Sequence, residues 1–327
     1  MERHDPIFVA GHRGLLGSAL VRRLHEAGFT RVLTRTHGEL DLGVPAAVEA
    51  LFQQIRPAAV ILAAARVGGI VANQSSPAEF ITDNLRIESA VIPAAHRAGV
   101  GRLIFFGSNC AYPLSCPQPM REEWIGTGAL EPTSLPYALA KLAGMTMCDA
   151  YNRQYGTAYL SLVPATLYGP GDHFDPQTSH VLSGLLRRVD QARLAGSPSV
   201  AVWSSGRVQR EFLYVDELAE ACVTLLEVSA DRVRALTADT RSVLNVGSGE
   251  EVSTLALAAL IKDVVGFEGQ LVLDPSQPDG AMRKCLDSRR IQQLGWSARI
   301  PLREGLRRTY AWYKEHAAGA REVAHAG

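Results

Sequence analysis

The sequence has no excess of charge of either sign, because lysine plus arginine and aspartate plus glutamate number 33 each. A neutral chain creates no global field that attracts nucleic acid or an anionic membrane, so an anionic ligand must be held by a few basic residues placed locally. Long apolar runs are also missing, since stretches such as residues 60–65 are far too short to span a bilayer. The start of the chain leads directly into a predicted strand and leaves no room for a secretory signal. These absences predict a cytoplasmic protein.

Cysteine is scarce and scattered. The five cysteines stand at positions 110, 116, 148, 222 and 285, and none belongs to a C-x-x-C pair. An odd number without paired spacing argues against a disulfide framework and against a zinc site. We therefore expect reduced thiols and no bound metal.

The apolar residues that are present alternate between short runs and helical periodicity over the first half of the chain. The predicted strands cover residues 7–10, 31–33, 60–65, 103–106 and 160–164. The predicted helices cover residues 15–27, 45–54, 78–98 and 137–155. Strands that alternate with helices form right-handed βαβ units. We predict an α/β fold, a Rossmann-type doubly wound parallel sheet with a smaller C-terminal α/β substrate domain.

The second half of the chain is richer in glycine and proline. Its predicted elements are helices at 181–194, 215–227, 254–265 and 302–315 and a strand at 243–246. We assign residues 1–164 to an NADP-binding domain, to which residues 212–247 return. Residues 165–211 and 248–317 form the predicted substrate domain, and residues 318–327 a flexible tail.

Three glycines join the first predicted strand to the first predicted helix. Gly11, Gly14 and Gly17 follow the pattern G-x-x-G-x-x-G. Glycines at such positions let the chain turn tightly, approach a pyrophosphate and pack the helix against the strand, while the phosphates bind free N–H groups at the helix start. The pattern alone also fits an ordinary glycine turn. Its place between the first strand and the first helix favours a dinucleotide site.

Two cations indicate which dinucleotide this site binds. Proteins that prefer NAD carry an acidic residue near the end of the second strand, for the ribose 2′-hydroxyl. Residues 33–37 contain no acid but do contain Arg35, and Arg13 lies in the glycine loop. Guanidinium groups suit a 2′-phosphate, although Arg35 also fits an ordinary solvated surface position. The sequence predicts NADP(H).

A Tyr-x-x-x-Lys pair supplies candidate catalytic residues. Tyr137 and Lys141 stand one turn apart on one face of a predicted helix. We expect the ammonium of Lys141 to lower the pKa of the phenol, so that Tyr137 exchanges a proton with a carbonyl or carbinol oxygen, and to reach the nicotinamide ribose. Ser108, just after the fourth strand, can hydrogen-bond the same oxygen. The pair alone arises by chance in many helices, but together with Ser108 and the glycine loop it indicates a reductase.

These residues resemble the extended short-chain dehydrogenase/reductase superfamily, which the glycine loop, Asn84, Gly107-Ser108 and the Tyr137/Lys141 pair all match. Longer stretches are similar to the GDP-L-fucose synthase family. They are Ala-Gly-His-Arg-Gly from residue 10, Ala-Ala-Arg-Val-Gly-Gly-Ile-Val-Ala-Asn from residue 64, Cys-Ala-Tyr-Pro from residue 110, Tyr-Asn-Arg-Gln-Tyr-Gly from residue 151 and Arg-Glu-Phe from residue 210. The similarity runs from about residue 7 to residue 312, nearly the whole chain.

The resemblance implies an NADPH-dependent epimerase/reductase that converts GDP-4-keto-6-deoxy-D-mannose to GDP-L-fucose. It implies that Cys110 and His180 are the acid/base pair of the epimerisation, although singly each fits a structural role. It implies a homodimer formed through helices 78–98 and 137–155. The residues expected at the GDP-sugar are Arg188, Trp203, Arg210 and Asp279. The residues expected at the cofactor are Gly11, His12, Arg13, Gly14, Leu15, Leu16, Gly17, Arg35, Asp41, Ala64, Ala65, Lys141, Pro164, Leu167 and His180.

Two positions depart from the family pattern. Asn109 stands where many relatives have a small hydroxyl residue, and Ala165-Thr166 replaces the expected Thr-Asn. Both border the reacting sugar or the nicotinamide, so an enzyme that inverts only one carbon, to give another deoxyhexose, stays open as an alternative. A nucleotide-sugar 4-epimerase is another. A 4,6-dehydratase would carry an acidic pair beside Ser108, and a non-enzymatic NADP sensor could dispense with the Tyr137/Lys141 pair.

Overall fold

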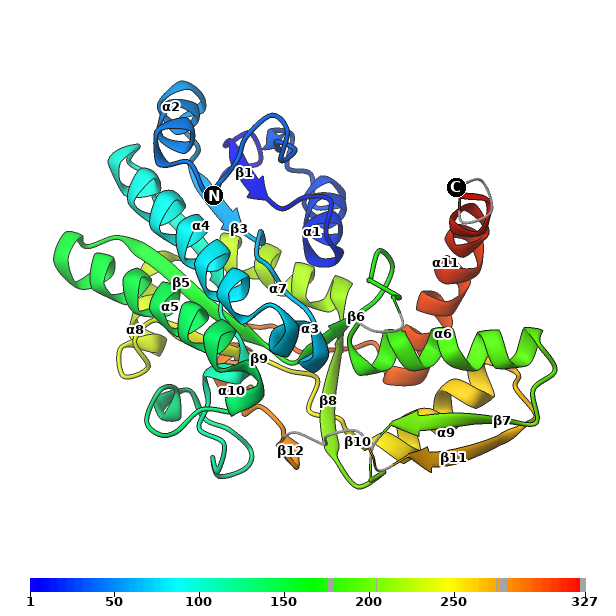
Figure 1. Cartoon of the computed structure of the whole chain (residues 1–327). Helices are drawn as coiled ribbons and strands as arrows, with labels where there is room; N and C mark the ends of the chain where they lie inside the picture. The colour runs from blue at the N-terminus through cyan, green and yellow to red at the C-terminus, as the bar shows by residue number, and fades with distance from the viewer. Residues whose placement is uncertain (176–178, 204, 275, 277–280, 324–327) are drawn as a thin grey trace.

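A parallel sheet of six strands forms the centre of the computed structural model, which describes residues 1–175, 179–203, 205–274, 276 and 281–323, the last seven as backbone only (Figure 1). The strand order is β2-β1-β3-β4-β5-β9, and each neighbouring pair is parallel. The strands are β1 (Ile7–Ala10), β2 (Val32–Leu33), β3 (Ala59–Leu62), β4 (Arg102–Phe106), β5 (Ala158–Pro164) and β9 (Val243–Val246). The predicted Rossmann-type fold class is confirmed.

Helices cover both faces of this sheet. On one face α1 (Leu15–Glu26) packs against α7 (Val215–Glu227), and on the other α2 (Pro45–Ile55), α4 (Pro77–Arg97) and α5 (Leu135–Tyr155) pack in a row (Figure 1). A parallel sheet whose strands are mostly apolar needs such cover on both sides.

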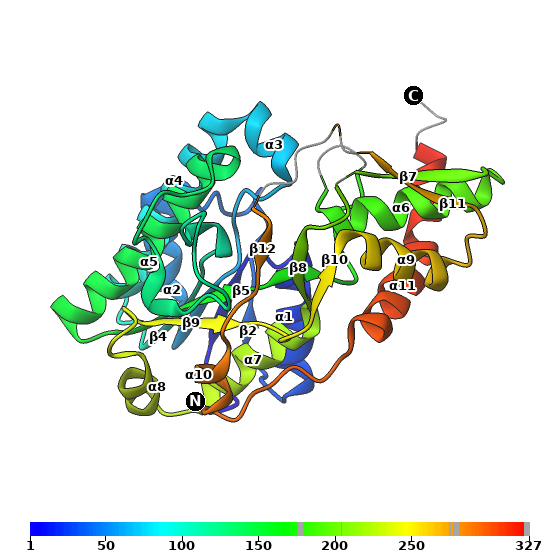
Figure 2. The ribbon, with the colours of Figure 1, turned by 90° about the horizontal axis from the view of Figure 1, so that it is seen from below.

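A second lobe is built around β8 (Gln209–Tyr214). This strand pairs with β6 (Thr166–Tyr168), β10 (Glu251–Ser253) and β12 (Arg283–Lys284). Figure 2 shows these short strands between the large sheet and the outer part of the lobe. The outer part consists of β7 (Ser199–Trp203) paired with β11 (Gln270–Asp274), and of helices α6 (Val181–Leu194), α9 (Thr254–Val265) and α11 (Leu302–Val323).

Two apolar cores correspond to the two lobes. The first gathers side chains from β1 through β5, from α7 and β9, and also from the segment 286–296. The second gathers side chains from α6, β7, β8, α9 and α11. The predicted domain boundaries at residues 164, 212 and 247 stay a prediction. Residues 286–296 pack on the first core, although the sequence analysis assigned them to the substrate domain.

Several elements depart from the sequence pattern. α11 continues to Val323, past the predicted end at residue 315 and into the predicted tail, of which residues 324–327 lie outside the described part. The remaining elements are α3 (Ile70–Ser75), α8 (Ala230–Thr237), α10 (Arg289–Gln292) and the 3-10 turns η1 (Asn109–Ala111), η2 (Glu122–Trp124) and η3 (Pro132–Ser134). Within the described residues, no helix combines the length and the apolar character needed to span a bilayer.

Candidate active site

The glycine loop lies where the strand order of the large sheet reverses, between the carboxyl ends of β1 and β3. Gly11 has a φ of 83°, and a Cβ there would lie 2.7 Å from the backbone nitrogen of Ala64. A Cβ on Gly17 would collide with the carbonyl oxygen of Gly11. Gly14 meets no such obstacle, since its nearest neighbour is 3.5 Å away, and it stands directly before α1. The loop is thus a tight turn that leads directly into the start of α1.

A cleft of about 650 Å³ opens beside this loop. The predicted cofactor residues that line it are Gly11, His12, Arg13, Gly14, Arg35, Asp41, Ala64 and Ala65. Leu15, Leu16 and Gly17 lie in the first turn of α1 and are not part of the lining of the cleft. The donor set fits a dinucleotide phosphate, because the cleft combines the glycine loop with cations.

Four arginines line the cleft, and the sequence analysis had singled out only Arg13 and Arg35. Arg66 is paired with Asp83 at 3.0 Å, and Arg86 also faces the cleft. An acid does lie nearby, since Glu39 accepts hydrogen bonds from the backbone and hydroxyl of Thr36. Those bonds, and then Arg35 and Arg13, lower the pKa of Glu39.

Ser108 and Tyr137 meet at the carboxyl end of β4. Ser108 follows that strand, and Tyr137 lies in the first turn of α5. Burial raises the pKa of Tyr137 far above its ordinary value, a negative charge on Cys110 adds to this, and a hydrogen bond with Ser108 opposes it. The expectation of a lowered phenol pKa is therefore wrong for this structure. The phenol remains protonated at neutral pH, as a proton donor must.

Lys141 is engaged elsewhere, which explains why it does not lower that pKa. Its ammonium lies 3.4 Å from a carboxylate oxygen of Glu88 on α4, and the two side chains are only 3% and 2% exposed. The ammonium also lies 4.5 Å from the centre of the Phe105 ring. Burial lowers the pKa of Lys141 against the effect of Glu88, and burial raises the pKa of Glu88 to about 7. The sequence analysis missed Glu88.

Gly144 makes this pairing possible. A Cβ at that position of α5 would lie 2.9 Å from the carboxyl carbon of Glu88 and would also collide with the Phe105 ring. The helices α4 and α5 therefore approach closely enough to enclose the ion pair.

Cys110 lies beside Ser108 at the start of η1. Its backbone N–H donates to the Ser108 hydroxyl at 3.1 Å. Its sulfur lies 3.7 Å from the ammonium of Lys284 on β12. Burial acts to raise the pKa of the thiol, but Lys284 and hydrogen bonds with Ser108 and Ser134 together bring the pKa below its ordinary value. The sequence analysis missed Lys284 and Ser134.

His180 stands immediately before α6, half-buried, next to Asp172. Burial lowers the pKa of the imidazole, and the carboxylate of Asp172 opposes this. Asp172 accepts hydrogen bonds from Ser183 and from the backbone of His173. Among the contacts of the described residues, none joins His180 to Cys110, so their predicted pairing stays a prediction.

The other predicted residues lie in the second lobe or at its border. The guanidinium of Arg188 stacks 3.9 Å from the centre of the Trp203 ring and donates to the carbonyl of Ala201. Arg210 lies on β8. Pro164 ends β5 and Leu167 lies in β6, outside the lining of the cleft. Asp279 lies outside the described residues.

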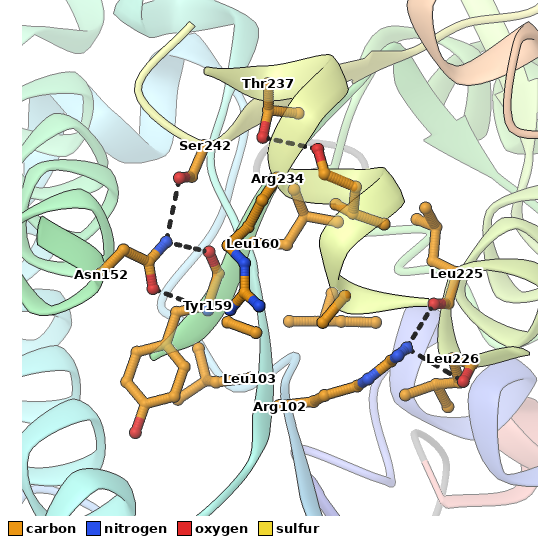
Figure 3. A pocket seen from close by; sticks show the side chains of 14 residues that line it. Arg102, Leu103, Asn152, Tyr159, Leu160, Leu225, Leu226, Arg234, Thr237 and Ser242 are labelled. Carbon is orange, nitrogen blue, oxygen red and sulfur yellow. Dashed lines mark hydrogen bonds between the residues drawn. The ribbon is translucent and has the colours of Figure 1, made fainter. Parts of the chain in front are cut away.

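A small hollow at the amino end of the large sheet contrasts with this site. It has room only for water, about 30 Å³, and lies near the starts of β4 and β5 (Figure 3). Arg102 there donates to the carbonyls of Leu225, Leu226 and Val228. These hydrogen bonds tie β4 to the end of α7, so we assign the Arg102 guanidinium a structural role and not a ligand-binding one.

Comparison with known proteins identifies the family. Residues 7–247 match the family described as NAD dependent epimerase/dehydratase. GDP-L-fucose synthase 1 of Arabidopsis thaliana is 51% identical over 312 residues, which cover 95% of this chain and 94% of that protein. GDP-L-fucose synthase of Escherichia coli is 47% identical over 310 residues, 95% of this chain and 97% of that one.

A solved structure agrees with these relatives. The GDP-L-fucose synthetase from Naegleria fowleri bound to NADP superposes with a TM-score of 0.84 at 25% identity, over 97% of this chain and 96% of that one. The chain belongs to the NAD dependent epimerase/dehydratase family and, within it, to the GDP-L-fucose synthases.

Proposed function

We propose that this enzyme converts GDP-4-keto-6-deoxy-D-mannose to GDP-L-fucose with NADPH, by epimerisation at carbons 3 and 5 and reduction at carbon 4. The observation that carries the proposal is the placement of the Cys110 thiol, with its lowered pKa, in one cluster with Ser108 and Tyr137. A base for carbon acids and a donor for the ketone oxygen thus share one site. The names of the relatives support the substrate.

Epimerisation begins with removal of a proton from a carbon next to the ketone. Cys110, as thiolate, takes that proton, and the electron pair moves to the ketone oxygen. Hydrogen bonds from Ser108 and Tyr137 stabilise the enolate oxygen. His180, in its protonated form, returns a proton on the opposite face, and the carboxylate of Asp172 beside it favours that form.

Reduction uses the same oxygen. NADPH, when bound by the cleft beside the glycine loop, supplies the two electrons and the hydrogen that carbon 4 gains. Tyr137 donates the proton that the oxygen gains, and Ser108 holds that oxygen in place. Lys141 lies one turn after Tyr137 on α5, where its ammonium pairs with the buried carboxyl group of Glu88.

Identification of the product tests the proposed function. Purified enzyme, GDP-4-keto-6-deoxy-D-mannose and NADPH should yield GDP-L-fucose, recognised by NMR. A product that retains the manno configuration at both carbons would show reduction without epimerisation and would overturn the epimerase half of the proposal.

A second candidate product deserves the same experiment because Asn109 borders the reacting thiol. Its amide oxygen lies 3.9 Å from the Cys110 sulfur, where many relatives have a smaller hydroxyl side chain. An enzyme that inverts one carbon would give a different deoxyhexose, and the NMR spectrum distinguishes the two outcomes.

The preferred cofactor is NADPH, supported by the arginines of the cleft. Arg35→Asp places a carboxylate near a 2′-phosphate and should reduce kcat/KM with NADPH by at least about tenfold, while NADH is affected less. Steady-state kinetics with both cofactors measure this. Arg56→Asp, on the turn after α2 and away from the lining of the cleft, is the matched control. Wild-type kcat/KM that is equal for NADH and NADPH would contradict the preference.

We also infer a homodimer in the cytoplasm. The helices α4 and α5 lie side by side at the surface (Figure 1) and expose Leu85, Leu135 and Leu139. Apolar side chains exposed on two adjacent helices suit a four-helix interface with a second copy. Light scattering at micromolar concentration should give twice the mass of the chain. The five free cysteines support a reducing compartment.

A further inference from the structure

The geometry points to Lys284 as the residue that activates Cys110, by holding its thiol as a thiolate and fixing the sulfur beside the reacting carbon. The inference rests on the proposed epimerase function and adds to it a positioning residue for the base. It assigns a role to a lysine far from every motif of the sequence, 174 positions away from the cysteine.

The distance and surroundings favour this role. The ammonium nitrogen lies 3.7 Å from the sulfur, and both side chains are half-buried. An ammonium this close to a thiol, shielded in part from water, stabilises the charged form of sulfur. Ser108 and Ser134 add hydroxyl hydrogen bonds, and the Tyr137 phenol is the other titratable group that faces the sulfur.

The other four cysteines provide an internal contrast. All four are buried. Burial raises the pKa of Cys116 to about 11 and the pKa of both Cys148 and Cys285 to about 12, and it raises that of Cys222 as well. Burial therefore acts in the same direction on every thiol. Cys148 also has a hydroxyl group, that of Ser161, and the Lys141 ammonium near it, but the Glu88 carboxylate opposes them and the pKa stays raised. At Cys110 the effects of Lys284 and of the two hydroxyl groups outweigh that of burial.

The backbone around Lys284 is held firmly in position. β12 pairs with β8, where Lys284 is in register with Arg210. The next residue, Cys285, donates its N–H to the side chain of Gln118 and accepts from the N–H of Met120 at 2.7 Å. Leu286 donates to the buried carboxylate of Glu211 at 2.8 Å. Lys284 is thereby fixed against the loop 112–131, which directly follows Cys110.

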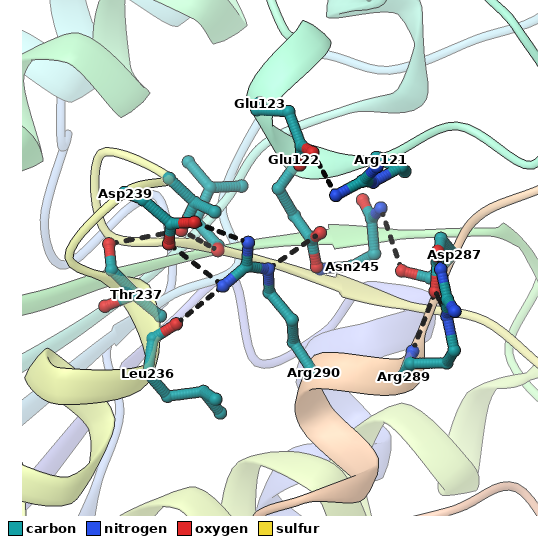
Figure 4. A network of polar contacts seen from close by, with 12 residues as sticks. Arg121, Glu122, Glu123, Leu236, Thr237, Asp239, Asn245, Asp287, Arg289 and Arg290 are labelled. Atoms are coloured by element: carbon teal, nitrogen blue, oxygen red, sulfur yellow. Dashed lines mark hydrogen bonds and ion pairs between the residues drawn. The ribbon is translucent and has the colours of Figure 1, made fainter.

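A buried polar network completes the connection (Figure 4). The Asn245 amide donates to the carbonyls of Met120 and Asp287, and its oxygen accepts from the hydroxyl of Tyr112, two residues after Cys110. Glu122 accepts from the N–H of Asn245 and pairs with Arg290. Both the segment that carries the thiol and the segment that carries the ammonium are thus tied to β9.

The Cys110 thiol loses its proton to water and forms a thiolate paired with the Lys284 ammonium. The thiolate then takes the proton from the carbon next to the ketone, and the electron pair of that C–H bond moves to the ketone oxygen. Because only the thiolate acts as base, the exchange rate rises as pH rises through the thiol pKa. Removal of the ammonium moves that rise to higher pH.

Alkylation of the full-length enzyme without substrate tests the inference directly. The rate of Cys110 modification by iodoacetamide, followed by mass spectrometry over about pH 6 to 10, reports its thiolate fraction. In the wild type, the midpoint should lie below about 8.5, the ordinary value for a thiol. Lys284→Met should raise the midpoint and slow alkylation at neutral pH about tenfold or more, and Lys284→Arg should restore much of the rate.

Arg283→Gln is the matched control, since the neighbouring guanidinium is paired with Glu251 at 2.6 Å and should leave the midpoint of Cys110 unchanged. A wild-type midpoint at or above the ordinary value overturns the inference without any variant. So does an unchanged midpoint in Lys284→Met accompanied only by a higher KM, which would make Lys284 a substrate-binding residue. The alkylation needs no turnover, so its outcome is separate from the product analysis that tests the proposed function.

Discussion

Tyr137→Phe should reduce the rate of ketone reduction by about 10²–10⁴-fold while cofactor binding stays unchanged. The substitution removes only the hydroxyl that donates the proton to the ketone oxygen. The half-buried ring keeps its edge-on contact with Phe80, at 6.1 Å between ring centres. NADPH consumption with the keto sugar measures the loss, and titration of NADPH fluorescence measures binding.

The pH dependence of wild-type reduction provides a second readout. Because burial raises the pKa of Tyr137, the phenol holds its proton through the neutral range and beyond. Loss of this proton should therefore cause no fall in the rate of reduction up to about pH 10, the ordinary pKa of a phenol.

Tyr159→Phe is the matched control for this prediction. Tyr159 is buried, and its hydroxyl has no hydrogen-bond partner among the described residues. Removal of this hydroxyl at the far end of the sheet should leave reduction near normal. Near-normal turnover in Tyr137→Phe would instead remove Tyr137 from the mechanism.

The parts of the site that could be predicted from the sequence depend on local spacing. Gly11, Gly14 and Gly17 lie within one loop, and Tyr137 and Lys141 lie one turn apart, so a linear pattern reveals them. The strands of the large sheet are likewise mostly apolar short runs. Eight of the predicted cofactor residues line the cleft of the structure, and their role at the cofactor stays a prediction.

The parts that could not be predicted depend on contacts between distant segments. Lys284 reaches Cys110 only because β12 pairs with β8, and two-residue strands leave no periodic signal. Glu88 meets Lys141 across two helices, 53 positions apart. One signal for Glu88 was present: it stands four residues after Asn84 on the buried side of α4, where an acid requires a partner.

Glu88 also explains why the predicted phenol pKa was wrong. A Tyr-x-x-x-Lys spacing places the ammonium near the phenol but does not show what else the ammonium contacts. A fully buried lysine needs a counter-charge, and Glu88 provides it. At Lys284 the ammonium has a different neighbour, the Cys110 thiol, whose pKa it lowers.

Cys110→Ser should separate the two halves of the reaction. The hydroxyl of serine ionises far above neutral pH even beside Lys284, so removal of a proton from carbon should fall by about 10²–10⁴-fold. Ser108, Tyr137 and Lys141 remain in place, so slow reduction of the unepimerised ketone should persist. In deuterated buffer, the wild-type product should carry deuterium at each inverted carbon, and the Cys110→Ser product should carry little.

The positions of deuterium in the wild-type product also decide between the candidate products. Label at carbons 3 and 5 supports GDP-L-fucose, and label at one carbon supports the single inversion that Asn109 and Thr166 leave open. His180→Ala should likewise impair exchange or reprotonation. Cys116→Ser is the matched control. Cys116 is a buried residue on the loop 112–131, and burial raises the pKa of its thiol to about 11. The product of this variant should carry as much deuterium as the wild-type product. Full deuterium exchange in Cys110→Ser would show that this thiol is structural and that the base is another residue, and the role inferred for Lys284 would fail with it.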